Sequence, residues 1–329
     1  MAQVLVTGGS GFIGSNLITA LLQQGREVYA LTRRPLAQHH PRLHEVRGDL
    51  FSTDSYRSQL GEVDTIFHCA GFISFSAEDD NTCHQINVEG TEALLTAVLQ
   101  CGSSPRFVHL SACAVFGFLQ NGDGMLDERA APSLTTASGY ARSKQEAERV
   151  VLQGVAQGLD GVIANISTVY GAGDHRLNSG SVIRSVLSGM RLIPPGGSSY
   201  IAMPDLISGL LALAAEGRSG ERYILNGENL SYRSLITRIA AVTGAPKPWF
   251  ALPELFRGPA VAAAWLLQQL PRRGGGVNLI TPQIIRETFG YKYFSNNKAV
   301  TELGWRPCHT LESAVDSALT YYRQQGLLP

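Results

Sequence analysis

The feature that most constrains the fold is the glycine-rich stretch VTGGSGFIGSNL at residues 6–17. Its glycines directly follow an apolar β-rich run and open an amphipathic helical stretch. Glycines at such a junction allow a tight turn, and they let the backbone lie against a pyrophosphate at the positive end of the next helix. The pattern predicts a dinucleotide-binding turn, with a plain glycine-rich loop as the alternative. The residues expected to contact the cofactor here are Gly8, Gly11, Phe12, Ile13 and Gly14.

Through the first half of the chain, short β-rich runs alternate with helical stretches. Strands are predicted at Val4–Thr7, Glu27–Thr32, Leu43–Arg47, Asp64–Cys69, Arg106–Ser111 and Gly161–Ile166. Helices are predicted at Phe12–Gln24, Ser55–Leu60, Cys83–Cys101 and Ser138–Gln153. Alternation of this kind is typical of βαβ units. It predicts an α/β fold with a doubly wound parallel sheet (Rossmann), whose ligands lie at the carboxyl ends of the strands.

After Tyr170 the pattern loosens into turns rich in glycine and proline. A helix near Leu206–Ala215 and a strand at Tyr223–Asn226 are expected to return to the main sheet. We therefore predict a dinucleotide-binding domain over 1–170, to which 206–227 returns. Residues 171–205 and 228–329 are expected to form a smaller, mostly C-terminal α+β substrate-binding domain.

Composition narrows the classes of partner. The formal net charge is zero, so no global basic field would hold nucleic acid or anionic lipid. The five cysteines include no CxxC pair, which favours a reduced cytoplasmic setting over a disulfide framework or a metal site. No signal peptide is expected, because the chain begins directly with a strand. The apolar run at 259–271 is too short for a membrane span; we expect a buried or pocket-lining helix, with surface membrane contact as the alternative.

The ends of the predicted strands suggest which cofactor binds. An acidic residue after the second strand usually binds the ribose 2′-hydroxyl of NAD, but here the sequence is Thr32, Arg33, Arg34. Because an arginine can pair with a 2′-phosphate, Arg33 favours NADP, and NAD stays open. After the third strand Asp49 and Leu50 would reach the adenine. After the fourth strand, the residues expected against the cofactor are Cys69, Ala70 and Gly71.

Tyr140 and Lys144 lie four residues apart in GYARSK, hence on one face of a predicted helix. A nearby ammonium favours the phenolate and would lower the pKa of Tyr140, making it a usable acid and base near neutrality. The alternative is a surface tyrosine stacked on a lysine stem. Four lysines occur in the whole chain, so the pair is informative.

Together these motifs resemble the extended short-chain dehydrogenase/reductases, the NAD(P)-dependent epimerase/dehydratase superfamily. The matching segments are TGGSGFIG, GDL, FHCAG, NVEGT, YARSK, STVYGAGD and NNKAVTELGWRP. The resemblance implies that Tyr140 is the acid/base and that Lys144 holds the nicotinamide ribose. It also implies that Ile166, Ser167 and Thr168 flank the nicotinamide. The predicted helix Glu89–Gln100 would form a homodimer interface in such a protein, although a plain core helix explains it equally well.

Within this superfamily, two positions argue against a sugar nucleotide. Binders of these substrates commonly have an Asn where this chain has Thr168, and an Arg where it has Ser198. The apolar stretch Trp249–Leu270 fits an apolar ligand better. The chain thus looks closest to the dihydroflavonol 4-reductase and 3β-hydroxysteroid dehydrogenase branch, which reduces ketones or aldehydes. An NDP-sugar epimerase/dehydratase and a non-catalytic NADP-binding redox sensor remain alternatives.

One family position departs from the pattern. The hydroxyl that normally assists the tyrosine belongs five residues before Gly117, where this chain has Ala112. Ser111 would replace it only if a bulge turned its side chain inward, because strand side chains alternate between faces. Ser133, Thr135, Thr136 or Ser138 is a second source, and catalysis by Tyr140 alone is the third. We expect Ser111.

Overall fold

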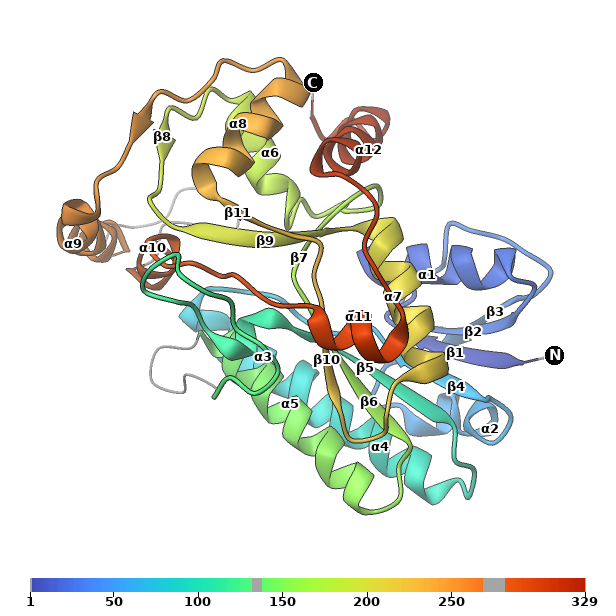
Figure 1. The fold of residues 1–329 in the computed structure, drawn as a ribbon. Helices are drawn as coiled ribbons and strands as arrows, with labels where there is room; N and C mark the ends of the chain where they lie inside the picture. The colour runs from blue at the N-terminus through green and yellow to red at the C-terminus, as the bar shows by residue number, and fades with distance from the viewer. Residues whose placement is uncertain (1, 132–137, 269–281, 329) are drawn as a thin grey trace.

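The computed structural model of the chain describes residues 2–131, 138–268 and 282–328 (Figure 1). Its centre is a seven-stranded parallel sheet in the order β10-β6-β5-β4-β1-β2-β3. The strands are β1 (Gln3–Thr7), β2 (Glu27–Thr32), β3 (Leu43–Arg47), β4 (Thr65–His68), β5 (Arg106–Ala112), β6 (Gly161–Ile166) and β10 (Arg222–Leu225). The predicted doubly wound sheet is confirmed.

The strand order reverses at β1, which lies between β2 and β4. Val4 pairs with Val28 of β2 on one side and with Thr65 of β4 on the other. The connections leaving β1 and β4 therefore diverge, and they open a crevice at the carboxyl edge of the sheet where ligands of such folds bind.

Helices cover both faces of the sheet (Figure 1). On one face, α1 (Phe12–Gln23), α7 (Met203–Glu216) and α11 (Asn297–Leu303) pack on the apolar side chains of the strands. On the other face lie α2 (Arg57–Leu60), α4 (Gly90–Gln100) and α5 (Gly139–Ala156). Because both faces are buried, the strands contain almost continuous apolar runs.

The helical run predicted at Cys83–Cys101 is not one uniform α-helix. It consists of α3 (Asp80–His84), a π-helical segment at Gln85–Glu89 and then α4. Single π turns inside helices are frequent at functional sites, and this one carries Asn87.

A second layer lies above the carboxyl edge of the main sheet (Figure 1). Its three strands are β7 (Thr168–Tyr170), β9 (Gly197–Ala202) and β11 (Glu228–Ser231). The helices α6 (Gly180–Leu187), α8 (Tyr232–Thr243) and α12 (Leu311–Gln324) enclose a separate apolar core with them. The predicted domain boundaries stay a prediction.

A peripheral part consists of β8 (Leu192–Ile193), β12 (Phe250–Ala251), α9 (Arg257–Gln268) and α10 (Pro282–Thr288). The expectation of a buried or pocket-lining helix is wrong for α9, because Trp265, Leu266 and Leu267 are more than half exposed. Residues 269–271 of that apolar run lie outside the described residues. Within the described ranges, no helix has both the length and the apolar character needed to cross a bilayer.

Candidate functional site

A cavity of about 440 Å³ opens at the carboxyl ends of β1, β2, β3 and β4. Eleven of the predicted cofactor residues line it, although they come from four separate parts of the sequence. They are Gly8, Gly11, Phe12, Ile13, Gly14, Arg33, Asp49, Leu50, Cys69, Ala70 and Gly71. The parallel strands bring them together because their carboxyl ends meet at one edge.

The glycine turn is closely packed. Gly8 has a φ of 68°, and a Cβ there would lie 2.8 Å from the backbone nitrogen of Ala70. A Cβ on Gly14 would overlap the carbonyl oxygen of Gly8. The turn therefore needs glycines both for its backbone conformation and for space. It opens the N-terminus of α1, so free backbone N–H groups face the cavity, as a pyrophosphate requires.

Charged groups from separate parts of the chain line the cavity. Arg33 and Arg34 are exposed at the end of β2. Burial opposes ionisation of the nearby Asp49, but hydrogen bonds from Ser52 and Phe51 and the charge of Arg33 outweigh it and lower its pKa. The turn at 174–178 also lines the cavity, with Asp174, His175, Arg176 and Asn178. No sequence pattern considered above indicated that this turn would lie at the cofactor site.

Lys144 lies on the buried face of α5, beside the cavity. Its Nζ donates a hydrogen bond of 2.8 Å to the Leu110 carbonyl oxygen, two residues before the end of β5. A Cβ on Gly71, in the cavity wall, would lie 3.4 Å from the same Nζ. Burial lowers the pKa of Lys144 to about 8, and the neighbouring Glu148 partly offsets that shift.

Tyr140 is buried one turn before Lys144. Its neighbours are Cys83, Ala112, Phe72 and Phe75, whose ring meets the Tyr140 ring edge-on at 5.9 Å between centroids. Burial raises the pKa of the phenol, so the predicted lowering by Lys144 is not found. The reason is geometric, because the ammonium is directed to Leu110 and not to Tyr140.

The structure contradicts the bulge expected at Ser111. β5 pairs with β6 in uninterrupted register, with Ser111 opposite Asn165 and Ala112 opposite Ile166. The buried Ser111 hydroxyl donates to Glu148, whereas Ala112 packs against Tyr140. Strict alternation thus directs the serine away from the candidate site. Ser138 is the N-cap of α5 and accepts from the N–H of Ala141. Ser133, Thr135 and Thr136 lie outside the described residues.

Ile166 is the last residue of β6, Ser167 and Thr168 follow it, and none of the three lines the cavity. Because Ile166 pairs with Ala112, the carboxyl end of β6 lies next to the carboxyl end of β5. The N–H of Ser167 donates to the Leu225 carbonyl oxygen, and Thr168 begins β7. Their predicted contact with the nicotinamide stays a prediction.

Comparison with known proteins agrees with this geometry. Residues 4–225 match the NAD dependent epimerase/dehydratase family. The chain belongs to this family. It is therefore an NAD(P)-dependent oxidoreductase or epimerase of the extended short-chain dehydrogenase/reductase type.

Several relatives of this family member are similar over their whole length. A 3 beta-hydroxysteroid dehydrogenase/Delta 5→4-isomerase of Mycobacterium tuberculosis is 32% identical over 98% of this chain and 90% of its own. Sterol demethylase protein B of Methylococcus capsulatus is 29% identical over 98% and 99%. Among solved structures, gox2253 superposes with a TM-score of 0.84 at 27% identity, over the full length of both chains. MoeE5 in complex with UDP-glucuronic acid and NAD has a TM-score of 0.75 at 25% identity, covering 98% of this chain and all of its own.

Two buried polar residues next to the Tyr–Lys pair were missed in the sequence analysis. Glu148 accepts hydrogen bonds from Ser111 and, at 2.6 Å, from Asn165 Nδ2, and Arg222 lies 3.5 Å away. Asn87 accepts from the N–H of Phe72 at 2.8 Å and donates to Ser143 Oγ at 2.9 Å. The first network braces the helix below Lys144, and the second ties the loop after β4 to α5. The i,i+4 spacing of Lys144 and Glu148 was a visible signal.

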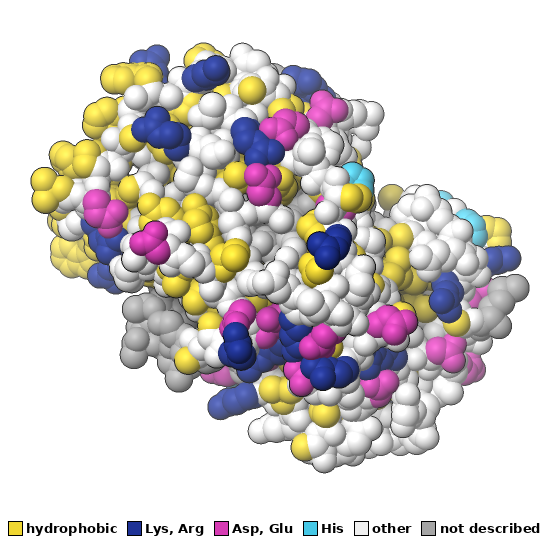
Figure 2. Space-filling view, viewed as in Figure 1, with side chains coloured by type: hydrophobic (Ala, Val, Ile, Leu, Met, Phe, Trp, Pro, Cys, Tyr) yellow, Lys and Arg dark blue, Asp and Glu magenta, His cyan; other side chains and the backbone are white. Residues whose placement is uncertain are grey.

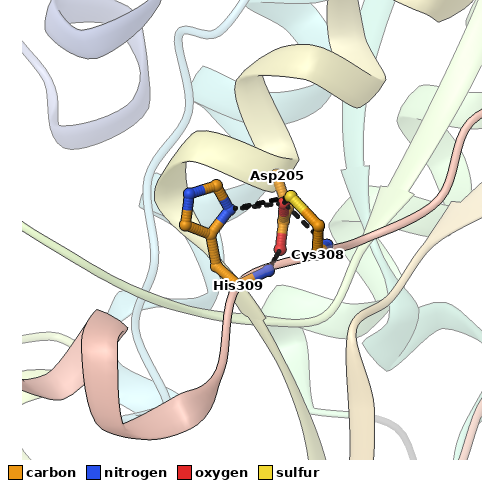
Figure 3. A group of neighbouring side chains, drawn as sticks. All are labelled: Asp205, Cys308 and His309. Atoms are coloured by element: carbon orange, nitrogen blue, oxygen red, sulfur yellow. Dashed lines mark hydrogen bonds and ion pairs between the residues drawn. The ribbon is translucent and has the colours of Figure 1, made fainter.

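A third polar cluster joins α7 to the C-terminal segment (Figure 3). The buried Asp205 accepts from the backbone N–H groups of Cys308 and His309, and His309 Nδ1 lies 2.7 Å from its Oδ1. The side-chain ligand atoms of these three residues lie within 4.8 Å of one another. Both carboxylate oxygens already accept backbone N–H groups, so the cluster is explained as a clamp on the chain after Trp305. Burial opposes ionisation, but the hydrogen bonds from His309 and Cys308 lower the pKa of Asp205.

Proposed function

We propose that this protein reduces the carbonyl group of an apolar substrate with NADPH, with Tyr140 as the proton donor. The observation that carries the proposal is the position of Tyr140 and Lys144. Both are buried on one face of α5, and the Lys144 ammonium borders Gly71 in the wall of the cleft. This position suits a residue that binds the nicotinamide ribose.

The residues present fit a dinucleotide. The glycines let the turn pack closely against the loop after β4 at the cavity wall, and the N-terminus of α1 that follows would hold a pyrophosphate. NADPH, when bound there, would supply a hydride for the carbonyl carbon. Tyr140 then donates its proton to the carbonyl oxygen, and its raised pKa keeps it protonated at neutral pH. Lys144 would orient the ribose.

An apolar substrate is supported by what surrounds Tyr140. Phe72, Phe75, Cys83 and Ala112 give the phenol an apolar environment. A sugar nucleotide would require cations or donors for its diphosphate, whereas Thr168 and Ser198 replace two residues that commonly serve there. Relatives named as acting on sterols and dihydroflavonols agree with this choice.

The test of the reaction is Tyr140→Phe assayed with NADPH on 3-ketosteroids, dihydroflavonols and UDP-glucose. We expect the ketone activity to fall about 10²- to 10⁴-fold with cofactor affinity unchanged. Tyr321→Phe, on α12, is the matched control and should keep its activity. Full activity of Tyr140→Phe would refute the proton-donor role. Turnover of UDP-glucose alone would favour the epimerase alternative, and NADPH binding without any turnover would favour the sensor.

The preference for NADP rests on Arg33. Its exposed guanidinium at the end of β2 is available to a 2′-phosphate. Arg33→Asp should weaken NADPH binding and shift the preference toward NADH, while Arg26→Asp, at an exposed position just before β2, should leave the ratio unchanged. An unchanged NADPH/NADH ratio in the Arg33 variant would remove this role.

A further inference from the structure

Large exposed apolar side chains gather on one peripheral part of the molecule. They come from β12, the 3-10 turn Glu254–Phe256 and α9. The residues that we call the α9 surface are Trp249, Phe250, Leu255, Trp265, Leu266 and Leu267. Leu255 is 86% exposed and Trp249 is 73% exposed. Hydrophobic side chains crowd the same side of the space-filling view where α9 lies (Figure 2).

Basic side chains border this surface. Arg191 directly precedes β8, which pairs with Phe250 of β12, and Lys247 lies two residues before Trp249. Arg286 lies on α10, which packs along α9. All three side chains are exposed, and within the described ranges none of them forms an ion pair. The region is therefore locally positive although the whole chain has no net charge.

Two carboxylates on the elements that form or border this surface are already paired. Glu254 forms an ion pair with Arg257, and Glu287 forms one of 2.6 Å with Lys292. Among the described residues, the surface therefore has three bordering cations without an ion pair, and two carboxylates that are already paired. A second copy of the same surface would bring the same excess of positive charge, whereas these cations favour an anionic partner. An anionic surface would satisfy them.

We propose that the α9 surface binds the headgroup region of an anionic lipid bilayer. Tryptophan favours the membrane–water interface because its ring is apolar and its N–H is polar. Exposed leucines on a helix lying in the interface plane insert into the acyl boundary, and bordering cations bind anionic headgroups. α9 has 12 residues, so it lies on the membrane and does not cross it. The proposal goes beyond the catalytic role and does not depend on it.

The test uses the intact protein and vesicles of two compositions. One is pure phosphatidylcholine, and the other is phosphatidylcholine and phosphatidylglycerol in equal parts. We expect co-sedimentation with the anionic vesicles at least about tenfold tighter than with the neutral ones, and weakening with added salt. Equal binding to both, or binding to neither, would overturn the proposal.

Fluorescence locates the contact, because the chain has three tryptophans and Trp305 is buried. Brominated acyl chains should quench Trp249 and Trp265, and the double variant Trp249→Phe/Trp265→Phe should lose the quenching. Quenching of Trp305 instead would place the contact elsewhere and refute the assignment.

Charge variants complete the test. Lys247→Glu combined with Arg286→Glu should weaken anionic-vesicle binding by roughly fivefold or more for each position. Arg149→Glu, at an exposed position on α5, is the matched control and should bind like the unmodified protein. Burial of Trp265 in a concentration-dependent dimer, without vesicle binding, would assign the surface to a second copy. NADPH turnover is not used in any arm, so failure here leaves the Tyr140 proposal standing.

Discussion

We predict that Lys144→Met raises the stability of the protein while it abolishes the activity of the candidate site. Burial lowers the pKa of Lys144 from about 10.5 to about 8. At roughly 1.4 kcal/mol per pKa unit, this difference corresponds to about 3 kcal/mol of free energy of unfolding. Below pH 8 the folded protein must keep a buried ammonium, which opposes folding. Methionine fills similar space without a charge.

The pH dependence follows from the direction of the shift. Between about pH 8 and 10.5 the unfolded chain holds a proton on Lys144 that the folded chain has lost, so the stability conferred by the wild-type residue rises with pH. Lys144→Met has no such titration. The free energy of unfolding of the variant should therefore exceed that of the wild type most below pH 8, and this difference should fall by about 3 kcal/mol toward pH 10.5.

The variant also loses the hydrogen bond to the Leu110 carbonyl oxygen, which offsets part of the stability gained by removing the buried charge. We therefore expect the variant to be about 1 kcal/mol more stable than the wild type near neutral pH, and inactive. The measurement is urea unfolding at a series of pH values for both proteins. Lys247→Met, at an exposed lysine, is the control for the loss of one lysine side chain. A difference for Lys144→Met that does not change with pH would refute the reasoning.

Two further predictions concern Asp205 and Ala112. Asp205→Asn should lower the free energy of unfolding by about 1–3 kcal/mol at neutral pH, because it removes the charge that the backbone N–H groups of Cys308 and His309 bind. Since the pKa of Asp205 is lowered by folding, its contribution is present above the ordinary carboxyl pKa and is lost as the pH falls through the folded value. Urea unfolding should thus show a smaller difference at about pH 3, and an equal one at both pH values would contradict the clamp. Ala112→Ser should raise kcat, by as much as the roughly hundredfold that one donor contributes, because position 112 faces Tyr140. Steady-state kinetics beside an Ala241→Ser control, at an exposed position on α8, would check this, and an unchanged or lower kcat would refute it.

The main sheet could be predicted because its strands are buried on both faces. β1 and β6 contain short, almost continuous apolar runs, and each is followed by a turn or helix signal that local sequence contains. The glycine turn directly follows the first strand, so it marks the carboxyl edge of the sheet. Parallel strands place all their carboxyl ends at this same edge. Eleven predicted cofactor residues therefore share one cavity without any prediction of their distances.

The polar networks could not be predicted in the same way. Glu148 accepts a hydrogen bond from the Ser111 hydroxyl, 37 residues away in the sequence, and Asn87 donates one to Ser143, 56 residues away. No local period relates these positions, so only the packing of α5 on β5 and on the π-helical segment brings them together. The prediction for α9 failed for a different reason. Its apolar sequence suggested burial, but an apolar run is buried only when another element covers it.

The Tyr140–Lys144 spacing predicted where the two side chains lie but not how the pKa of Tyr140 is shifted. The four-residue spacing places Lys144 on the same helix face, but spacing does not decide where a flexible ammonium is directed. The Leu110 carbonyl oxygen of β5 accepts that hydrogen bond. Desolvation is then unopposed at the phenol and raises its pKa. A tyrosine that stays protonated is a proton donor first, which suits the reduction of a carbonyl better than the oxidation of an alcohol.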